Sequence, residues 1–172
     1  KDPFLGVAES TISWPYAVPS NTINVSIGNP TTYIMYNRMN FDWFYTDSNI
    51  NDDTRWQLEK TIYDPCPAGW RVPAFGPEEI WKDLDALSLT YDSFNSGISV
   101  KTGDSTAAWY PMSGYRNHIG TLINSENKGS YWSVNSNKYG QSFHLSLGID
   151  GDVSQDRNKS RACGLSVRCV KE

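Results

Sequence analysis

The 172-residue chain has no long hydrophobic run and no cluster of basic residues. No apolar stretch approaches the roughly 18–20 residues that a helix needs to cross a bilayer, so we expect no membrane insertion by this segment. Lys and Arg number 15 against 19 Asp and Glu, and neither basic residue type gathers along any stretch. The electrostatic footprint of a protein that binds phosphate backbones is therefore missing, and nucleic acid is not an expected partner.

Histidine is also scarce, and the carboxylates are scattered. His118 stands in the loop-like "YRNHIGT", and His144 falls on the polar face of a predicted strand, so we expect each to be a surface or hydrogen-bonded residue. Neither stands in a recognisable context for a cysteine nucleophile and its base. The densest carboxylates are Asp150, Asp152 and Asp156, which we interpret as turn residues. We expect no catalysis, no cofactor and no metal.

Three cysteines, Cys66, Cys163 and Cys169, leave one over in any pairing. Cys66 stands between Pro65 and Pro67 in "YDPCPAGWRVP". Each proline fixes its own φ and biases the residue before it toward extended backbone, so the thiol is presented from a stiff segment. That geometry suits either a cross-link or a reactive site. Three reduced cysteines in an intracellular protein are the alternative, because sequence alone does not set the redox state.

The polar residues are mainly Asn, Ser, Thr and Gly, and charged residues make up only 20% of the chain, while seven Trp and ten Tyr contribute to 13% aromatics. Turn-forming residues combined with many aromatics favour short strands and long ordered loops, a composition that we interpret as extracellular. The beginning, "KDPFLGVAES", has neither an initiator Met nor the features of a signal peptide. We therefore expect a processed chain or a domain of a longer protein, with any export signal upstream.

Prolines make residues 1–25 look like an extended lead-in or linker, and we expect one domain over residues 26–172. Short strands are predicted at 22–29, 31–37 and 41–46. The spacing of Asp47, Asn49 and Asn51 imitates the start of a calcium loop, but Asp52 stands where the turn needs Gly and Leu58 where the last ligand needs Glu. A solvated loop is the simpler interpretation.

One segment, "GPEEIWKDLDALSL" at 76–89, predicts an amphipathic helix, because Pro77 suits its first position and Ile80, Trp81, Leu84 and Leu87 recur at helical spacing. Trp81 is expected in the core. Further on, 141–151 alternates as a strand with Phe143, Leu145 and Leu147 inward, and 163–172 alternates as a terminal strand. One helix among short strands predicts an α+β class.

Five stretches together resemble the Fibrobacter succinogenes major paralogous domain: "KTIYDPCPAGWRVP", the helical segment with its Trp, "YPMSGYRN", "GSYWSV" and "GLSVRCVKE". The resemblance runs from Ser26 to Glu172. This family is abundant in secreted and surface proteins of Bacteroidetes, often in lipoproteins and fimbrillin-like adhesins. The resemblance implies a C-type-lectin-like or sulfatase-modifying-factor-like fold, with one or two short helices on small twisted antiparallel sheets and long ordered loops.

The disulfide that we favour joins Cys66 to Cys169, the two cysteines inside the resembling motifs. It would tie the helix-bearing half to the closing strand and leave Cys163 as a free thiol. Closing a loop of roughly 100 residues is worth about 4–5 kcal/mol in the chain-entropy model. Arg71 and Arg168, in the same motifs, are expected to form hydrogen bonds or ion pairs within the fold.

The function implied is that of a non-catalytic, exported module for adhesion or recognition on the extracellular or outer-membrane surface. Its partners would be carbohydrate, a surface protein of a host or neighbouring cell, or fimbrial subunits. Aromatic faces and polar side chains of the second half suit glycans, and the nominated residues are Trp109, Tyr110, Tyr115, Arg116, Asn117, Tyr139 and Asp150. The calcium motifs of sugar-binding C-type lectins are not visible.

Two alternatives stay open. One is a copper oxidase of the formylglycine-generating type that uses Cys163 and Cys169, although thiolates six residues apart on one strand lie roughly 20 Å apart, too far for one metal without a fold-back near Gly164. The other is a purely structural spacer domain.

Overall fold

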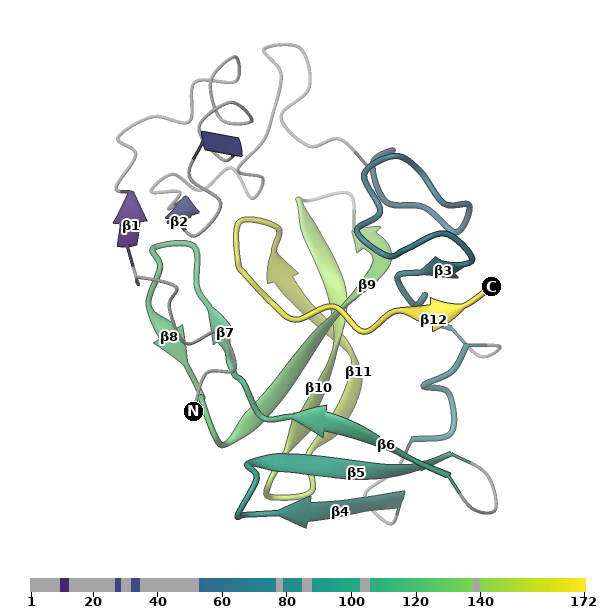
Figure 1. Cartoon of the computed structure of the whole chain (residues 1–172), viewed down its shortest axis with the longest axis vertical. Coiled ribbons are helices and arrows are strands. Elements are labelled where there is room, and N and C mark those ends of the chain that lie inside the picture. Colours follow the sequence, from purple (N-terminus) through teal and green to yellow (C-terminus); the bar gives the residue numbers. More distant parts are fainter. Residues whose placement is uncertain are drawn as a thin grey trace.

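The computed structural model describes residues 10–12, 27–28, 32–34, 53–76, 79–84, 88–102, 106–137 and 140–172. Within these ranges, twelve strands form five small sheets (Figure 1). Ile27 and Gly28 are the only residues of the same ranges that lie in an α-helix. This part of the chain is therefore built almost entirely from strands, turns and extended loops.

Two sheets have three strands each. One has the order β4–β5–β6 (Leu89–Asp92, Gly97–Thr102 and Thr106–Pro111), and the other the order β11–β10–β9 (Val153–Ser160, Gln141–Gly148 and Lys128–Asn137). The remaining sheets are strand pairs: parallel β1 and β2 (Ser10–Ile12 and Thr32–Ile34), and antiparallel β3 and β12 (Trp70–Arg71 and Val170–Lys171) and β7 and β8 (Tyr115–Arg116 and Leu122–Ile123). β10 confirms the strand predicted from the alternation at 141–151.

The main core lies between the two three-stranded sheets (Figure 1). Leu145 and Leu147 of β10 are fully buried there, together with Tyr131 of β9. They share one cluster with residues of the other sheet and its surroundings, which are Trp81, Ile98, Val100, Tyr110 and Met112. Burial of these apolar side chains is the main force that holds the sheets together.

The predicted α+β, C-type-lectin-like class with one or two short helices is wrong, since the described residues of the predicted helix form successive turns instead. In residues 79–84, N–H groups donate to the carbonyl three positions earlier, as Leu84 does to Trp81 at 3.1 Å. An α-helix would instead use the carbonyl four positions earlier. The Trp81 carbonyl also accepts a hydrogen bond from the Gln155 side chain of β11. Helical periodicity is a weak signal, and here tertiary contacts, including the burial of Trp81 in the core, accompany the turns that replace the helix.

Trp81 itself is in the core, as expected, and is only 2% exposed. Its indole N–H donates to the Tyr110 hydroxyl over 3.2 Å. Arg71 forms an ion pair with Glu79 at 3.1 Å, and this contact holds the turns against β3. Of the residues that suggested an amphipathic helix, Trp81 and Leu84 therefore do pack on the core from a chain of turns, whereas Ile80 is 49% exposed and Leu87 lies outside the described residues.

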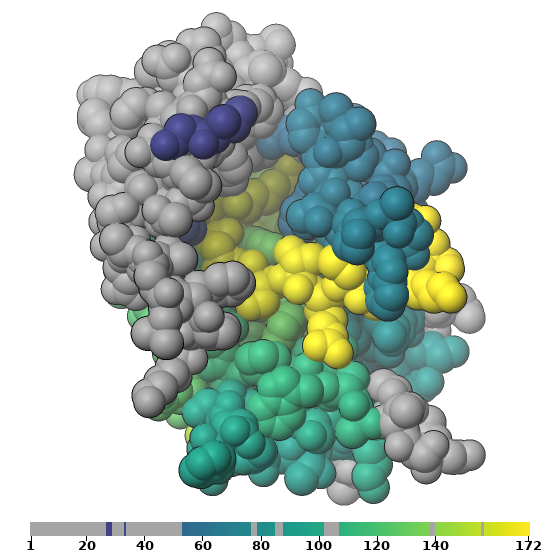
Figure 2. All heavy atoms as spheres, viewed as in Figure 1, coloured from purple at the N-terminus to yellow at the C-terminus, as the bar shows by residue number. Residues whose placement is uncertain are grey.

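The C-terminal segment runs beside β9 before it reaches β3 (Figure 1). The Trp132 N–H donates to the Ser166 carbonyl at 2.9 Å, and the Ser166 N–H donates to the Ser130 carbonyl at 3.1 Å. The terminal strand is shorter than predicted, because only Val170–Lys171 pair regularly. Figure 2 shows this segment, in yellow, at the surface between the loop that carries Cys66, in blue, and the sheet that contains β5 and β6, in green.

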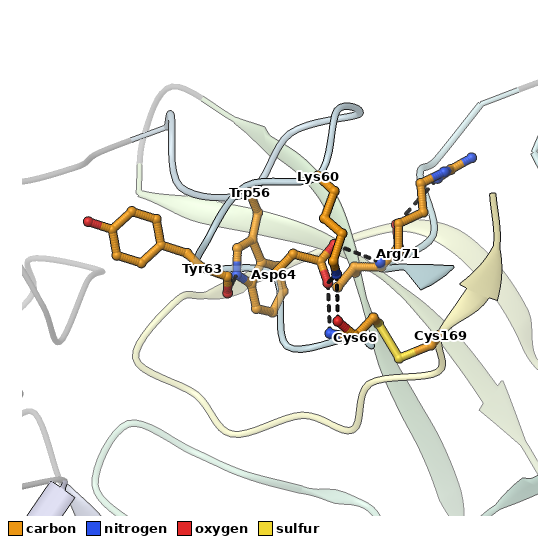
Figure 3. Close-up of a disulfide and its surroundings, with 8 residues drawn as sticks. Trp56, Lys60, Tyr63, Asp64, Cys66, Arg71 and Cys169 are labelled. Carbon is orange, nitrogen blue, oxygen red and sulfur yellow. Dashed lines mark hydrogen bonds and ion pairs between the residues drawn. A yellow bond between two sulfur atoms is a disulfide. The ribbon is translucent and has the colours of Figure 1, made fainter. Parts of the chain in front are cut away.

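The disulfide between Cys66 and Cys169 is confirmed, with Cα atoms 5.7 Å apart (Figure 3). Beside it, the Asp64 carboxylate accepts hydrogen bonds from the backbone N–H groups of Cys66, at 2.8 Å, and Val72, at 3.1 Å. Lys60 also forms an ion pair with Asp64 at 2.9 Å. The bridge lies in a second small core that includes Val72 and Val134.

The carboxylate of Asp64 stays ionised because its bonds outweigh its burial. Burial alone would raise its pKa, but the Lys60 ammonium and the two backbone N–H groups hold the pKa below its ordinary value of 3.8. The proline-bracketed segment is thus fixed by one charged group on one side and by the disulfide on the other. Cys66 is therefore a structural residue: its thiol is in the disulfide, and its N–H donates a charge-assisted hydrogen bond to Asp64.

Removing the bridge should destabilise the protein strongly. Cys66→Ala with Cys169→Ala opens a loop that spans 103 residues, so we expect the free energy of unfolding to fall by about 4–5 kcal/mol. Urea denaturation followed by tryptophan fluorescence measures the change, with Cys163→Ala as the control that leaves the bridge intact. A loss below about 1 kcal/mol would show that the tie contributes little.

Candidate functional site

A cleft of about 580 Å³ opens on the surface where three parts of the chain meet. The first part is the turn between β4 and β5, with Asn95 and Ser96. The second is residues 111–116, which lead from β6 into β7, and the third is residues 164–166 of the C-terminal segment. Tyr33, Leu122 and Ser125 complete the described lining. A volume of this size lies in the range typical of small-molecule sites.

Backbone hydrogen bonds between the walls hold the cleft in shape. Arg116 and Gly164 exchange both of their N–H and C=O groups, at 2.9 and 2.8 Å. The Gly114 N–H donates to the Lys128 carbonyl at 2.8 Å, which joins the cleft to β9. Gly114 has a φ of +65°, and a Cβ there would lie 2.2 Å from the Ile123 carbonyl oxygen. Only glycine fits this position, so the chain turns tightly at the wall.

The lining combines hydroxyl groups with apolar surface. Its small polar side chains are Asn95, Ser96, Ser113, Ser125 and Ser166. Two of these hydroxyls, on Ser113 and Ser166, lie 3.0 Å apart and link two walls. Pro111, Tyr115 and Leu122 supply apolar area, and Leu122 is 46% exposed. Each hydroxyl can donate and accept, so the cleft suits a ligand that does the same.

Tyr115 is held from outside the cleft by Lys159. The ammonium donates to the Tyr115 hydroxyl at 2.9 Å and lies 4.2 Å from the centre of its ring. Arg116, the one charged residue of the described lining, donates to the Gly120 carbonyl at 2.9 Å. Both side chains are therefore positioned before any ligand arrives.

Tyr33 connects β2 to the far side of the site. Its hydroxyl lies 2.6 Å from the Ala162 carbonyl and 3.1 Å from that of Asn117. Burial, with the nearby Cys163, raises the pKa of Tyr33 above its ordinary value. The hydroxyl is protonated at neutral pH, as for any tyrosine, and donates to these two carbonyls.

The cleft brings together only some of the nominated residues. Tyr115 and Arg116 line it. Asn117 supports the neighbouring turn, because its side-chain oxygen accepts from the N–H groups of Ile119, at 3.1 Å, and Thr121, at 2.9 Å. Tyr139 lies outside the described residues, as do Asp47 and Asn51 of the calcium-like loop.

Three other nominees lie elsewhere. Tyr110 is only 3% exposed and belongs to the core. The Trp109 ring covers Gly97, where a Cβ would come within 2.0 Å of it. Asp150 lies in the turn after β10 and accepts a hydrogen bond from the Asp152 N–H at 3.2 Å. Trp109 and Tyr110 also hold Arg168, which donates to the Trp109 carbonyl at 2.7 Å and lies over the Tyr110 ring, so its expected internal role is confirmed.

Sequence reasoning did not find the serines and Leu122 of the cleft. Isolated Ser and Leu residues carry no local signal of a site. Ser113 and Ser166 stand inside the motifs "YPMSGYRN" and "GLSVRCVKE", but neither motif indicated that these serines line a cleft. Long-range backbone pairings bring these side chains together: residues 164–166 pair with β9 and Arg116, Met112 bonds to Ser96, and β8 pairs with β7.

The cysteines offer little nucleophilic or metal-binding chemistry in this state. Cys169 is bonded to Cys66, so it cannot form a thiolate pair with Cys163. Cys163 is free and partly buried, and burial raises its pKa although the nearby Lys159 acts in the opposite direction. In the described ranges, no three His, Cys, Asp or Glu side chains gather closely enough to hold a metal ion.

His144 is buried, although the alternation predicted it on a polar face. It is 2% exposed and packs edge-on to Trp132, with ring centres 6.1 Å apart. The polar-face placement is wrong because both faces of the β9–β10–β11 sheet are covered, whereas the alternative of a hydrogen-bonded His144 agrees with its bond to the Arg157 backbone. Its Nδ1 has no hydrogen-bond partner within the described part of the chain. Burial, together with the positive charges of Lys159 and Arg157, lowers the pKa of His144 from 6.5 to about 4.

Comparison with family models, with curated proteins and with solved structures finds no match for this chain. In the described residues, no helix combines the length and the apolar character needed to span a lipid bilayer.

Stability should fall in mild acid because of His144. The fold disfavours the charged imidazolium of His144, whereas the unfolded chain binds the proton freely. The stability that neutral His144 contributes is therefore complete above pH 6.5 and is lost as the pH falls to about 4. We expect a loss of about 3 kcal/mol in the free energy of unfolding over this range. Urea denaturation at several pH values measures it.

The variant His144→Gln serves as the control, since it keeps the carboxylates Asp64 and Asp152 and removes the imidazole. Its free energy of unfolding should change less with pH than that of the wild type. An NMR titration that places the pKa of His144 at or above 6.5 would contradict the prediction.

Proposed function

We propose that this protein is an extracellular, non-catalytic recognition module whose cleft binds carbohydrate in adhesion. The observation that carries the proposal is the lining of the cleft, which combines serine hydroxyls with the Tyr115 ring and the exposed Leu122 side chain. A sugar presents hydroxyls at its edge and C–H groups on its faces. Hydroxyls pair with side chains that donate and accept, and C–H faces pack on aromatic or aliphatic surface.

The rigid walls support the same proposal. Binding costs conformational entropy when loops must be ordered, and a cleft whose walls are already joined avoids much of that cost. The paired Arg116 and Gly164 backbones and the Lys159–Tyr115 contact order the cleft in advance. Preorganisation matters for sugars in particular, because each hydrogen bond to a sugar hydroxyl replaces one to water and adds only about 0.5–1.5 kcal/mol.

The disulfide is compatible with an extracellular location, since such bonds persist in oxidising compartments. We place the module, by the resemblance of its motifs, in a fimbrillin-like or lipid-anchored adhesin at the outer-membrane surface of a Bacteroidetes-type bacterium. The ligand would then be a glycan of a host or neighbouring cell, a glycan carried by a surface protein, or one presented by fimbrial subunits.

The copper-oxidase alternative would first need reduction of the Cys66–Cys169 bridge, because Cys169 is one of its two thiolates. In the spacer alternative, the domain has no ligand and the cleft has no binding role. Absence of ligand binding in the test below is the result that it predicts.

The test is a glycan array followed by isothermal titration calorimetry with the best-bound glycan. We expect saturable binding by the wild type and a loss of about tenfold or more in affinity for Tyr115→Ala, because the variant removes the ring that packs on the sugar. Ser113→Ala should lower affinity about threefold to tenfold through a lost hydrogen bond.

Tyr63→Ala is the matched control, since Tyr63 is 50% exposed and lies on the disulfide loop, outside the cleft (Figure 3). It should bind like the wild type. No binding to any glycan, or equal binding by Tyr115→Ala and the wild type, would overturn the proposal.

A further inference from the structure

Phe94 lies at the tip of the turn between β4 and β5 and is 93% exposed. Its ring therefore gains almost nothing from burial, the usual source of stabilisation by aromatic residues. The next two residues, Asn95 and Ser96, are part of the cleft wall. Consecutive Cα atoms are only about 3.8 Å apart, so the ring is attached at the rim of the cleft.

The turn that carries Phe94 is held firmly by one side chain. Asp92 accepts hydrogen bonds through one carboxylate oxygen from the N–H groups of Phe94, at 2.9 Å, and Asn95, at 3.2 Å. Its other oxygen accepts from the Asn95 side-chain amide at 2.7 Å. Hydrogen bonding by Asn95 lowers the pKa of Asp92 below its ordinary value, so the carboxylate stays ionised and keeps these bonds into more acidic solution than a free aspartate would.

The other end of the turn is joined to the cleft itself. The Ser96 carbonyl accepts from the Met112 N–H at 2.8 Å, and Met112 also lines the cleft. Ser96 has a φ of +49°, a left-handed conformation that is uncommon for a residue with a side chain. The turn is thus constrained at both ends, and the backbone of the exposed aromatic residue is fixed relative to the wall.

From this placement we infer that Phe94 forms a second subsite, on which the next ring of a longer saccharide stacks when its first ring occupies the cleft. The inference rests on the proposed function and adds the class of ligand, an oligosaccharide of at least two rings. An aromatic face excludes water well from the C–H face of a sugar. A fixed backbone lowers the entropy that such a contact costs.

The test compares an oligosaccharide that the protein binds with the monosaccharide that forms its cleft-bound end. Phe94→Ala should weaken oligosaccharide binding about threefold to tenfold, the range expected for one aromatic contact, and leave monosaccharide binding unchanged. Phe94→Tyr keeps the aromatic face and should bind both ligands like the wild type. Calorimetry with the purified wild type and both variants measures the six affinities.

Ile62→Ala is the control, because Ile62 is 92% exposed but lies on the loop of the disulfide. It should change neither affinity. Equal oligosaccharide affinity for Phe94→Ala and wild type, or an equal loss for both ligands, overturns the second subsite and leaves the cleft proposal standing. A wild-type protein that binds no saccharide overturns the proposed function itself.

Discussion

The bond between Cys66 and Cys169 ties the C-terminal segment to the proline-bracketed loop, and the shape of the cleft depends on where that segment lies. Residues 164–166 form one wall of the cleft only three to five positions before Cys169. The same residues pair with β9 and with Arg116. Because these pairings are few and isolated, the covalent tie limits how far the segment can move, and the Asp64 carboxylate fixes the loop at the other end.

The molecule gains its order from connections between small sheets rather than from one large sheet. The Trp132 and Ser166 backbones join the C-terminal segment to β9, and Gly114 joins the cleft to the same strand. The main core lies beneath, between two three-stranded sheets. A surface made of turns and loops is thereby held on a packed interior, which is the usual arrangement of binding sites on rigid scaffolds.

Sequence reasoning succeeded where the signal was local or lay in a motif. The alternation at 141–151 predicted β10, the spacing around Trp81 predicted its burial, and the motifs predicted the disulfide. It failed where distant residues decide the outcome. The segment predicted as a helix packs Trp81 on the core from turns and bonds to Gln155 of β11, and His144 is buried because its sheet is covered on both faces. Of the residues that line the cleft, the sequence nominated only Tyr115 and Arg116, because segments far apart in the chain form the cleft through backbone pairing.

The wide separation of the bridged cysteines affects how the protein is made. During synthesis, Cys66 remains a free thiol until the chain has grown by 103 residues to Cys169. Cys163 is made six positions before Cys169, the correct partner of Cys66. A mispaired bridge is therefore the first one that the growing chain can form. Thiol–disulfide exchange corrects such errors, and it requires a thiolate that attacks a sulfur of the existing bridge. Burial raises the pKa of Cys163 in the finished fold, which lowers its thiolate fraction and so slows its attack on the correct bridge.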